Sequence, residues 1–117
     1  MADRTLELTL LFDFFGELLT EKQREYFDLH YNSDLSLSEI GQLYGISRQG
    51  VRGVISDAEA AMRRYEEKTG VVARFIDMQN RLEILEKKSA HLAELLAGTE
   101  EGALAAEIAA GFPELKG

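Results

Sequence analysis

The feature that most constrains the fold of this chain is a pair of helix-start signals that follow each other closely. Thr20 is followed three residues later by Gln23, and Ser36 is followed in the same way by Glu39. In this arrangement, the capping box, each of the two side chains accepts a hydrogen bond from the other residue's backbone N–H at the first turn of a helix. We therefore expect a short helix directly after each signal.

A sharp turn should follow the second of these helices. Gly45 lies where the chain must leave that helix in a left-handed conformation, and Ser47 can cap the start of the next one. Gly41 is small where the two helices would meet. These features predict a helix-turn-helix over residues 37–55. Its expected core consists of apolar residues at helical spacing: Leu37, Ile40, Leu43, Ile46, Val51, Val54 and Ile55.

The remainder of the chain also has helical character, because Leu, Glu, Ala, Lys and Arg dominate and Pro113 is the only proline. Gly70 should end the fourth helix, and Gly111 with Pro113 should open a C-terminal tail. The expected helices cover residues 4–19, 21–31, 37–43, 48–68, 71–97 and 103–110. The predicted fold is an all-α bundle with a helix-turn-helix and a long C-terminal helix. We expect a domain over residues 1–70 and a helical extension over residues 71–117, joined in one compact unit.

Two of these helices carry more apolar surface than a short domain needs. The N-terminal helix is apolar around most of its circumference, so it should be covered on more than one side. In the long helix, 4-3 spacing with Ser89 as its one polar position predicts a coiled-coil-like stripe of Val71, Phe75, Met78, Leu82, Leu85, Leu92 and Leu96. Both surfaces would be buried in a two-fold homodimer, or else the two helices would cover each other within one chain.

The composition weighs against several other classes of protein. The chain has no cysteine, so disulfides and thiolate metal sites are excluded. His30 and His91 lie on different expected helices, and no phosphate-cradling loop is present, so we expect no enzyme, metal or cofactor. His30 should pack between helices. Because Asp13 and Glu17 interrupt the first apolar run, we expect no signal peptide, no membrane insertion and a cytoplasmic location.

In a DNA-reading helix-turn-helix, the first turns of the second helix enter the major groove. Arg48, Gln49 and Arg52 are long enough there to reach base edges or phosphates, and Ser47 at the helix start suits a phosphate. The lesser candidates are Ser56 on the same helix and, for the phosphate backbone, Lys22 and Arg24 on the helix that starts at residue 21. The alternative is an exposed helix face on which the arginines pair with Glu39 or Asp57.

The formal net charge of −8 opposes nucleic-acid binding, because Lys and Arg supply most of the affinity for phosphate. Residues 1–19 carry one basic and four acidic side chains, residues 20–70 carry seven and nine, and residues 71–117 carry five and eight. None of these segments is net basic. Any binding of nucleic acid should therefore be weak and sensitive to salt unless dimerisation doubles the contacts.

The stretch LLTEKQREYFDLHYNSDLSLSEIGQLYGISRQGVRGVI, followed by EKTG, resembles the YlxM proteins, small relatives of region four of sigma factors. The resemblance covers about residues 6–70, and its specific parts are TEKQR, SLSEI and GISRQ. It implies nucleic-acid binding through Ser47, Arg48, Gln49 and Arg52. This chain departs from the family at Gly50, where alanine is expected, and at Arg52, where an aromatic residue is expected. These departures bear on fine specificity and not on the fold.

The resemblance also implies a link to the signal recognition particle, with its RNA or its targeting GTPase as a partner. Two hypotheses follow. The first is a dimeric DNA-binding regulator or accessory factor. The second is an adaptor of the signal recognition particle that binds protein or RNA without reading DNA, which would suit the acidic composition.

Overall fold

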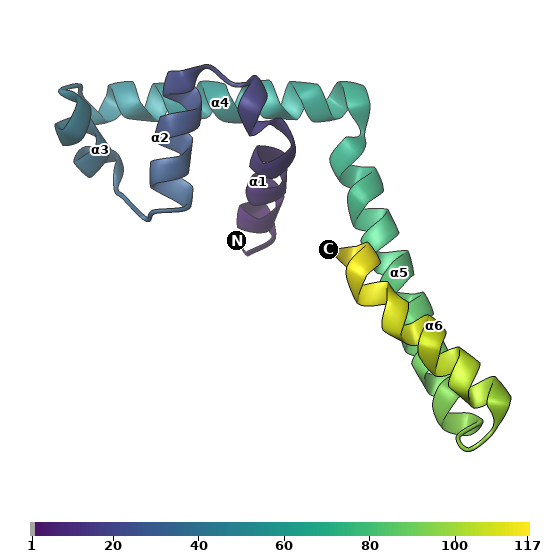
Figure 1. The fold of residues 1–117 in the computed structure, drawn as a ribbon. Helices are drawn as coiled ribbons and strands as arrows, with labels where there is room; N and C mark the ends of the chain where they lie inside the picture. The colour runs from purple at the N-terminus through teal and green to yellow at the C-terminus, as the bar shows by residue number, and fades with distance from the viewer. Residues whose placement is uncertain (1) are drawn as a thin grey trace. The chain divides into compact units, whose positions relative to one another are not determined.

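The computed structural model describes residues 2–117, and the side chains from Thr5 onward (Figure 1). All the regular structure of these residues is helical, as the sequence predicts. The elements are α1 (Ala2–Phe15), the 3-10 helix η1 (Gly16–Leu18), α2 (Glu21–Tyr31), α3 (Leu37–Tyr44), α4 (Arg48–Thr69), α5 (Val71–Leu95) and α6 (Glu100–Lys116).

The contacts between Cα atoms divide the chain into two compact units, Met1–Val72 (unit 1) and Ala73–Gly117 (unit 2). The sequence predicts one compact unit with a boundary after Gly70. The division falls two residues later because Val72, at the start of α5, is buried in the core of unit 1, whereas the rest of α5 packs with α6.

The helix-start signals form the predicted hydrogen bonds. The Thr20 hydroxyl accepts from the Gln23 N–H at 3.2 Å, and the Gln23 side chain accepts from the Thr20 N–H at 3.0 Å. Ser36 and Glu39 exchange the same pair of bonds, both at 3.0 Å. Both capping boxes are therefore confirmed, and they fix where α2 and α3 begin.

The capping box of α3 gives the first testable prediction. Replacing Ser36 with alanine removes the acceptor of the Glu39 N–H, and we expect unit 1 to lose about 1 kcal/mol of unfolding free energy in a urea titration. The Ser36 backbone N–H, followed by its hydroxyl, holds the pKa of Glu39 below its usual value of 4.5. The contribution of Glu39 is thus complete above pH 4.5 and is lost as the pH falls through the lower folded-state pKa. A Glu39→Ala loss that is equal at pH 7 and at pH 3 would contradict this.

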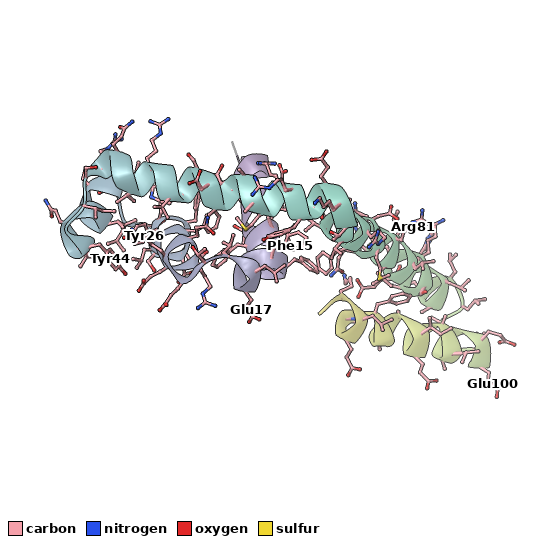
Figure 2. All side chains as sticks on the ribbon, turned by 90° about the horizontal axis from the view of Figure 1, so that it is seen from above. Phe15, Glu17, Tyr26, Tyr44, Arg81 and Glu100 are labelled. Carbon is pink, nitrogen blue, oxygen red and sulfur yellow. The ribbon has the colours of Figure 1, made fainter. Side chains whose placement is uncertain are left out.

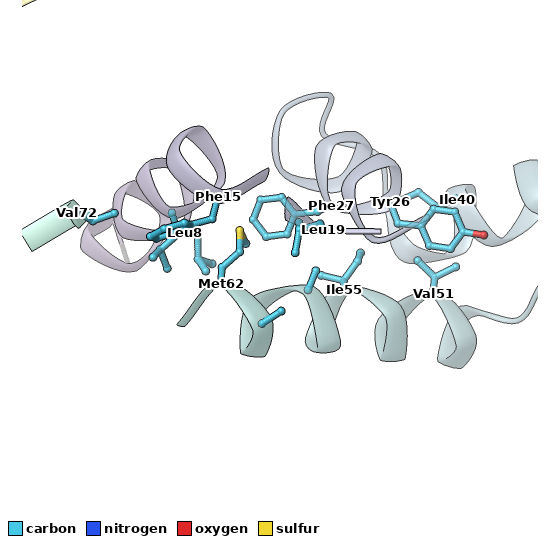
Figure 3. Close-up of a cluster of buried hydrophobic side chains, with 13 residues drawn as sticks. Leu8, Phe15, Leu19, Tyr26, Phe27, Ile40, Val51, Ile55, Met62 and Val72 are labelled. Carbon is cyan, nitrogen blue, oxygen red and sulfur yellow. The ribbon is translucent and has the colours of Figure 1, made fainter. Parts of the chain in front are cut away.

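The core of unit 1 lies along α4, which contacts α1, α2 and α3 (Figures 1 and 3). Phe27 of α2 is at its centre, with its ring 4.8 Å from that of Phe12 and 4.5 Å from that of Tyr31. The buried apolar residues are Leu8, Leu11, Phe15, Leu19, Tyr26, Phe27, Ile40, Val51, Ile55, Ala58, Ala61, Met62 and Val72.

Two expectations for unit 1 are wrong. Leu43 was expected in the core but is 65% exposed, because its neighbour Tyr44 instead packs its ring 4.8 Å from that of Tyr26. The N-terminal helix ends at Phe15 instead of residue 19, and η1 replaces its last turn. Leu6 and Leu18 remain exposed, so unit 1 does not cover the whole apolar surface of this segment.

In unit 2, α5 and α6 form an antiparallel hairpin (Figure 1). The C-terminal helix is longer than the predicted 103–110, and it continues through Gly111 and Pro113 to Lys116. Its last turn is held by α5: the Lys116 ammonium lies 2.6 Å from the Glu86 carboxylate, and the Gln79 amide donates to the Lys116 carbonyl at 2.8 Å. These contacts offset the cost of a proline inside a helix.

Among the described residues, no helix combines the length and the apolar character that crossing a membrane requires.

Candidate nucleic-acid interface

Close approach between α3 and the start of α4 shapes the turn of the helix-turn-helix. The Ile46 N–H donates to the Gly41 carbonyl at 3.0 Å, and a Cβ atom on Gly41 would lie only 2.6 Å from the Ile46 carbonyl oxygen. Gly45 has φ 69° and ψ 32°, the left-handed conformation that favours glycine. Both glycines are therefore required by the turn.

The first turns of α4 divide their residues between the core and the surface. Val51 and Ile55 are buried, whereas the predicted site residues Arg48, Gln49, Arg52 and Ser56 are all exposed. Figure 2 shows nitrogen-tipped side chains projecting outward from this end of α4. The Ser47 hydroxyl caps the helix by accepting from the Gly50 N–H at 3.0 Å. Five of the predicted site residues thus lie at one end of one helix.

The two arginines of this surface are not held by the acids considered as alternative partners. Within residues 5–117, neither Arg48 nor Arg52 forms an ion pair, and the Glu39 carboxylate is bonded to the Ser36 backbone. Their guanidinium groups therefore remain available to a ligand.

The turn and the first part of α4 also differ in charge from the rest of the chain. Residues 40–56 form the longest stretch without Asp or Glu, and they include Arg48 and Arg52. A charge count over residues 20–70 averages this region with the acids of α2 and of the later turns of α4. A finer charge count along the sequence would have found it.

The predicted phosphate contacts of α2 lie in different surroundings. Arg24 lines a surface hollow with Phe12 and with three acidic residues, Glu21, Glu25 and Asp28. The Lys22 ammonium lies 5.8 Å from the centre of the Tyr26 ring, where it makes a cation–π contact. The positive charge of Arg24 is therefore offset by its acidic neighbours, and Lys22 is the better candidate of the two for a phosphate contact.

A polar hollow of about 220 Å³ lies beside α4, and the sequence did not predict it. Arg52 and Ser56 line it together with His30, Tyr31, Leu37, Ile55 and Glu59. The Tyr31 hydroxyl donates to the Glu59 carboxylate at 2.8 Å, and His30 Nδ1 donates to the Leu35 carbonyl at 2.8 Å. His30 thus stabilises the connection between α2 and α3, in keeping with the packing role expected for it.

Tyr44, at the end of α3, was likewise not singled out from the sequence. Its ring lies beside Tyr26 (Figure 2), and its hydroxyl donates to the Glu25 carboxylate, which raises the pKa of Tyr44. The described part of the chain contains no cluster of three side chains suited to hold a metal ion.

Comparison with known proteins agrees with this architecture. A family model described as "Putative helix-turn-helix protein, YlxM / p13 like" (UPF0122) matches residues 2–100. The chain is 47% identical to a UPF0122 protein of Thermoanaerobacter sp. strain X514 over 87 residues, which are 74% of each chain. It is 49% identical over 84 residues to a UPF0122 protein of Acetivibrio thermocellus, covering 71% of this chain and 72% of the relative.

A third relative extends the similarity over nearly the whole chain. The UPF0122 protein of Desulforamulus reducens is 36% identical over 111 residues, 95% of this chain and 86% of the relative. No solved structure matches the chain. The matched region includes the complete helix-turn-helix and all of α5, so this chain belongs to the YlxM / p13-like family of helix-turn-helix proteins.

Proposed function

We propose that this protein binds DNA through the first turns of α4, as a regulator or accessory factor. The observation that carries the proposal is the exposure of Arg48, Gln49 and Arg52 at the start of the second motif helix, in the stretch of residues 40–56 that contains no Asp or Glu. In helix-turn-helix proteins this part of the second helix lies in the major groove.

The chemistry of these side chains suits base edges and phosphates. An arginine can bond both acceptors of guanine, and a glutamine can bond adenine in the same bidentate way. The N-terminus of α4 attracts a phosphate, and the backbone at Gly53 faces open space. A duplex could therefore approach this helix closely.

Unit 1 as a whole is acidic, with eight basic and thirteen acidic residues. The basic surface of α4 must act against this field, so binding should be weak and should fall steeply with salt. We therefore include a homodimer in the proposal, because two copies present two recognition helices to one duplex.

Titration of a labelled duplex at low salt tests the proposal. The double variant Arg48→Ala plus Arg52→Ala should bind at least tenfold more weakly than the parent chain, since each good bidentate contact contributes about 1–3 kcal/mol. The matched control is Arg64→Ala plus Lys68→Ala, which removes the same charge from exposed positions near the other end of α4. The control should change affinity much less.

Two results would contradict the proposal. One is the absence of duplex binding by the parent chain at low salt, and the other is an equal loss in the two double variants, which would show a charge effect without a reading surface.

The second candidate function is an adaptor of the signal recognition particle. It is favoured by the net charge of −8 and by Gly50 and Gly53, which leave part of the recognition helix without side chains. Purified targeting GTPase and purified particle RNA, titrated separately, distinguish the two functions. Saturable binding to either one, with no binding to duplex DNA, would favour the adaptor.

A further inference from the structure

Most of the side chains between the two helices of the unit 2 hairpin are small or polar. Beyond Val72, the least exposed residues of α5 are Gln79, Leu82, Glu86, Ser89 and Ala93, and Leu96 directly after the helix continues their regular 3-4 spacing. The corresponding residues of α6 are Gly102, Ala105, Ala109, Phe112 and Lys116. These two rows face each other, as the bonds from Lys116 to Gln79 and Glu86 show. Only two of these eleven residues, Leu82 and Leu96, are leucines.

The stripe predicted from the sequence overlaps this contact row only in part, at Leu82 and Leu96. Its residues Met78, Leu85 and Leu92 are 62%, 50% and 49% exposed. Each of them directly precedes a contact residue. Helix α6 repeats this pattern, because Leu104, Ile108 and Leu115 also directly precede contact residues and are 52–67% exposed.

These two exposed rows lie on one face of the hairpin. From one residue to the next, the direction in which the side chain points rotates by about 100° around the helix axis. When two antiparallel helices are viewed along one direction, this rotation is clockwise in one helix and counter-clockwise in the other. Residues that directly precede the contact rows of α5 and α6 consequently point to the same side. We call this side, with Met78, Leu85, Leu92, Leu104, Ile108 and Leu115, the bulky face.

The opposite face of the hairpin is different in kind. The residues that directly follow the contact rows are small or polar: Asn80, Glu83, Lys87, Ala90 and Glu94 on α5, Ala97 in the turn, and Ala103, Ala106, Ala110 and Pro113 on α6. Most of the exposed large apolar side chains of unit 2 thus lie on the bulky face, as expected of an interaction surface, while Phe75, Ile76 and Ile84 lie elsewhere on α5.

We infer that the bulky face is covered by the bulky face of a second copy of this chain, so that two hairpins form a four-helix bundle. The inference rests on the dimeric form of the proposed function. It commits to one arrangement, in which the two-fold axis runs parallel to the hairpin and each α5 lies over α6 of the other copy.

The positions of residues along the axis of the hairpin support this arrangement. Gln79 of α5 lies beside Lys116 of α6. Because the two helices are antiparallel, any two residues of α5 and α6 whose numbers sum to about 195 lie at the same height along this axis. With the axis parallel to the hairpin, Leu85 of one copy lies near Ile108 of the other, and Leu92 lies near Leu104. Apolar side chains thus meet apolar side chains along the whole face.

The charges beside the bulky face are complementary in the same register. Arg81 and Lys88 also directly precede contact residues of α5, so they lie on the same side of the hairpin as the bulky face, and Figure 2 shows Arg81 projecting away from α6. Arg81 also pairs with Asp77 on its own helix at 3.0 Å. Glu107 and Glu114 lie on the outer flank of α6. The arrangement places Lys88 level with Glu107 of the second copy and Arg81 level with Glu114. The alternative, α5 over α5, would bring the basic flanks together.

The mass of the full-length chain in solution at micromolar concentrations, from sedimentation equilibrium, tests the inference without any nucleic acid. We expect a dimer. Leu85→Glu should weaken self-association at least tenfold, because it places a charge in the bulky face. The matched control is Ile84→Glu, since Ile84 is the adjacent residue, is 54% exposed, and points away from both α6 and the bulky face. It should change the dissociation constant less than twofold, and circular dichroism should show equal helix content in both variants.

A charge exchange tests the register. Lys88→Glu and Glu107→Lys should each weaken the dimer several-fold, and the double variant should restore it. A monomeric parent chain, a Leu85→Glu variant that dimerises normally, equal losses for Leu85→Glu and Ile84→Glu, or a double variant that is no better than the single ones would each overturn the inference. A monomer that still binds duplex DNA would refute this inference and leave the DNA-binding proposal standing.

Discussion

Replacing Phe27 with alanine should lower the unfolding free energy of unit 1 by about 3–5 kcal/mol, the usual cost of deleting a buried aromatic ring. The side chain is 1% exposed and packs between the rings of Phe12 and Tyr31. No neighbour can fill the cavity without giving up its own contacts. A domain of this size has little more stability than this to lose, so the variant should be largely unfolded at 37 °C.

The tyrosines make this experiment specific to unit 1. The four of the chain, Tyr26, Tyr31, Tyr44 and Tyr65, all lie in residues 1–72. Tyrosine fluorescence during urea unfolding therefore reports that unit alone. Leu43→Ala is the control, because Leu43 is 65% exposed and its truncation should change stability by less than about 0.5 kcal/mol. A large loss from Leu43→Ala would instead place this residue in the core.

Adding one methyl group at Gly41 should be the second large effect. The new Cβ atom of Gly41→Ala would lie 2.6 Å from the Ile46 carbonyl oxygen, and this oxygen belongs to the backbone of the turn, so it cannot rotate away. We expect a net loss of roughly 1–3 kcal/mol, although alanine is the better helix former.

Gly53→Ala is the matched control for this prediction. It makes the same chemical change in a helix of the same motif, but nothing lies within 4 Å of the added Cβ. Here the gain in helix propensity should stabilise unit 1 by about 0.5–1 kcal/mol. Urea titrations followed by tyrosine fluorescence should therefore give changes of opposite sign. Two changes of the same sign would show that the turn relaxes around the methyl group.

Features that depend on neighbours in the sequence could be predicted well. The capping boxes at Thr20 and Ser36 and the left-handed Gly45 are set by bonds and angles within a few residues, so their sequence signals suffice. These signals gave the all-helical fold, the helix-turn-helix and the starts of α2, α3 and α4. The candidate site depends on the same signals, because they set the residue at which α4 begins, and Arg48 and Arg52 lie in the first two turns of this helix.

Features that depend on distant residues could not be predicted. Leu43 has the right helical spacing for the core, but Tyr44 takes the place beside Tyr26. Pro113 is a local stop signal, yet the contacts of Lys116 with α5 keep α6 helical beyond it.

The contact row of α5 is a third such case. The sequence predicts an apolar stripe that a second copy or the N-terminal helix would cover, whereas the row facing α6 shares only Leu82 and Leu96 with its apolar residues. Gly102 and Ala105 of α6 are buried, and the Gly102 backbone lies against the carbonyl of Leu96 in the turn that follows α5. Several large side chains of α5 remain exposed on another face of the helix.

Because α4 is one continuous helix, its first turns and the core of unit 1 are ordered together. The same helix carries Arg48 near one end and the fully buried Met62 further along. A ligand would thus meet a surface that is already rigid, and association would cost little conformational entropy. Occupancy of that surface should also raise the melting temperature of the whole of unit 1 through mass action, even though the ligand touches only its edge.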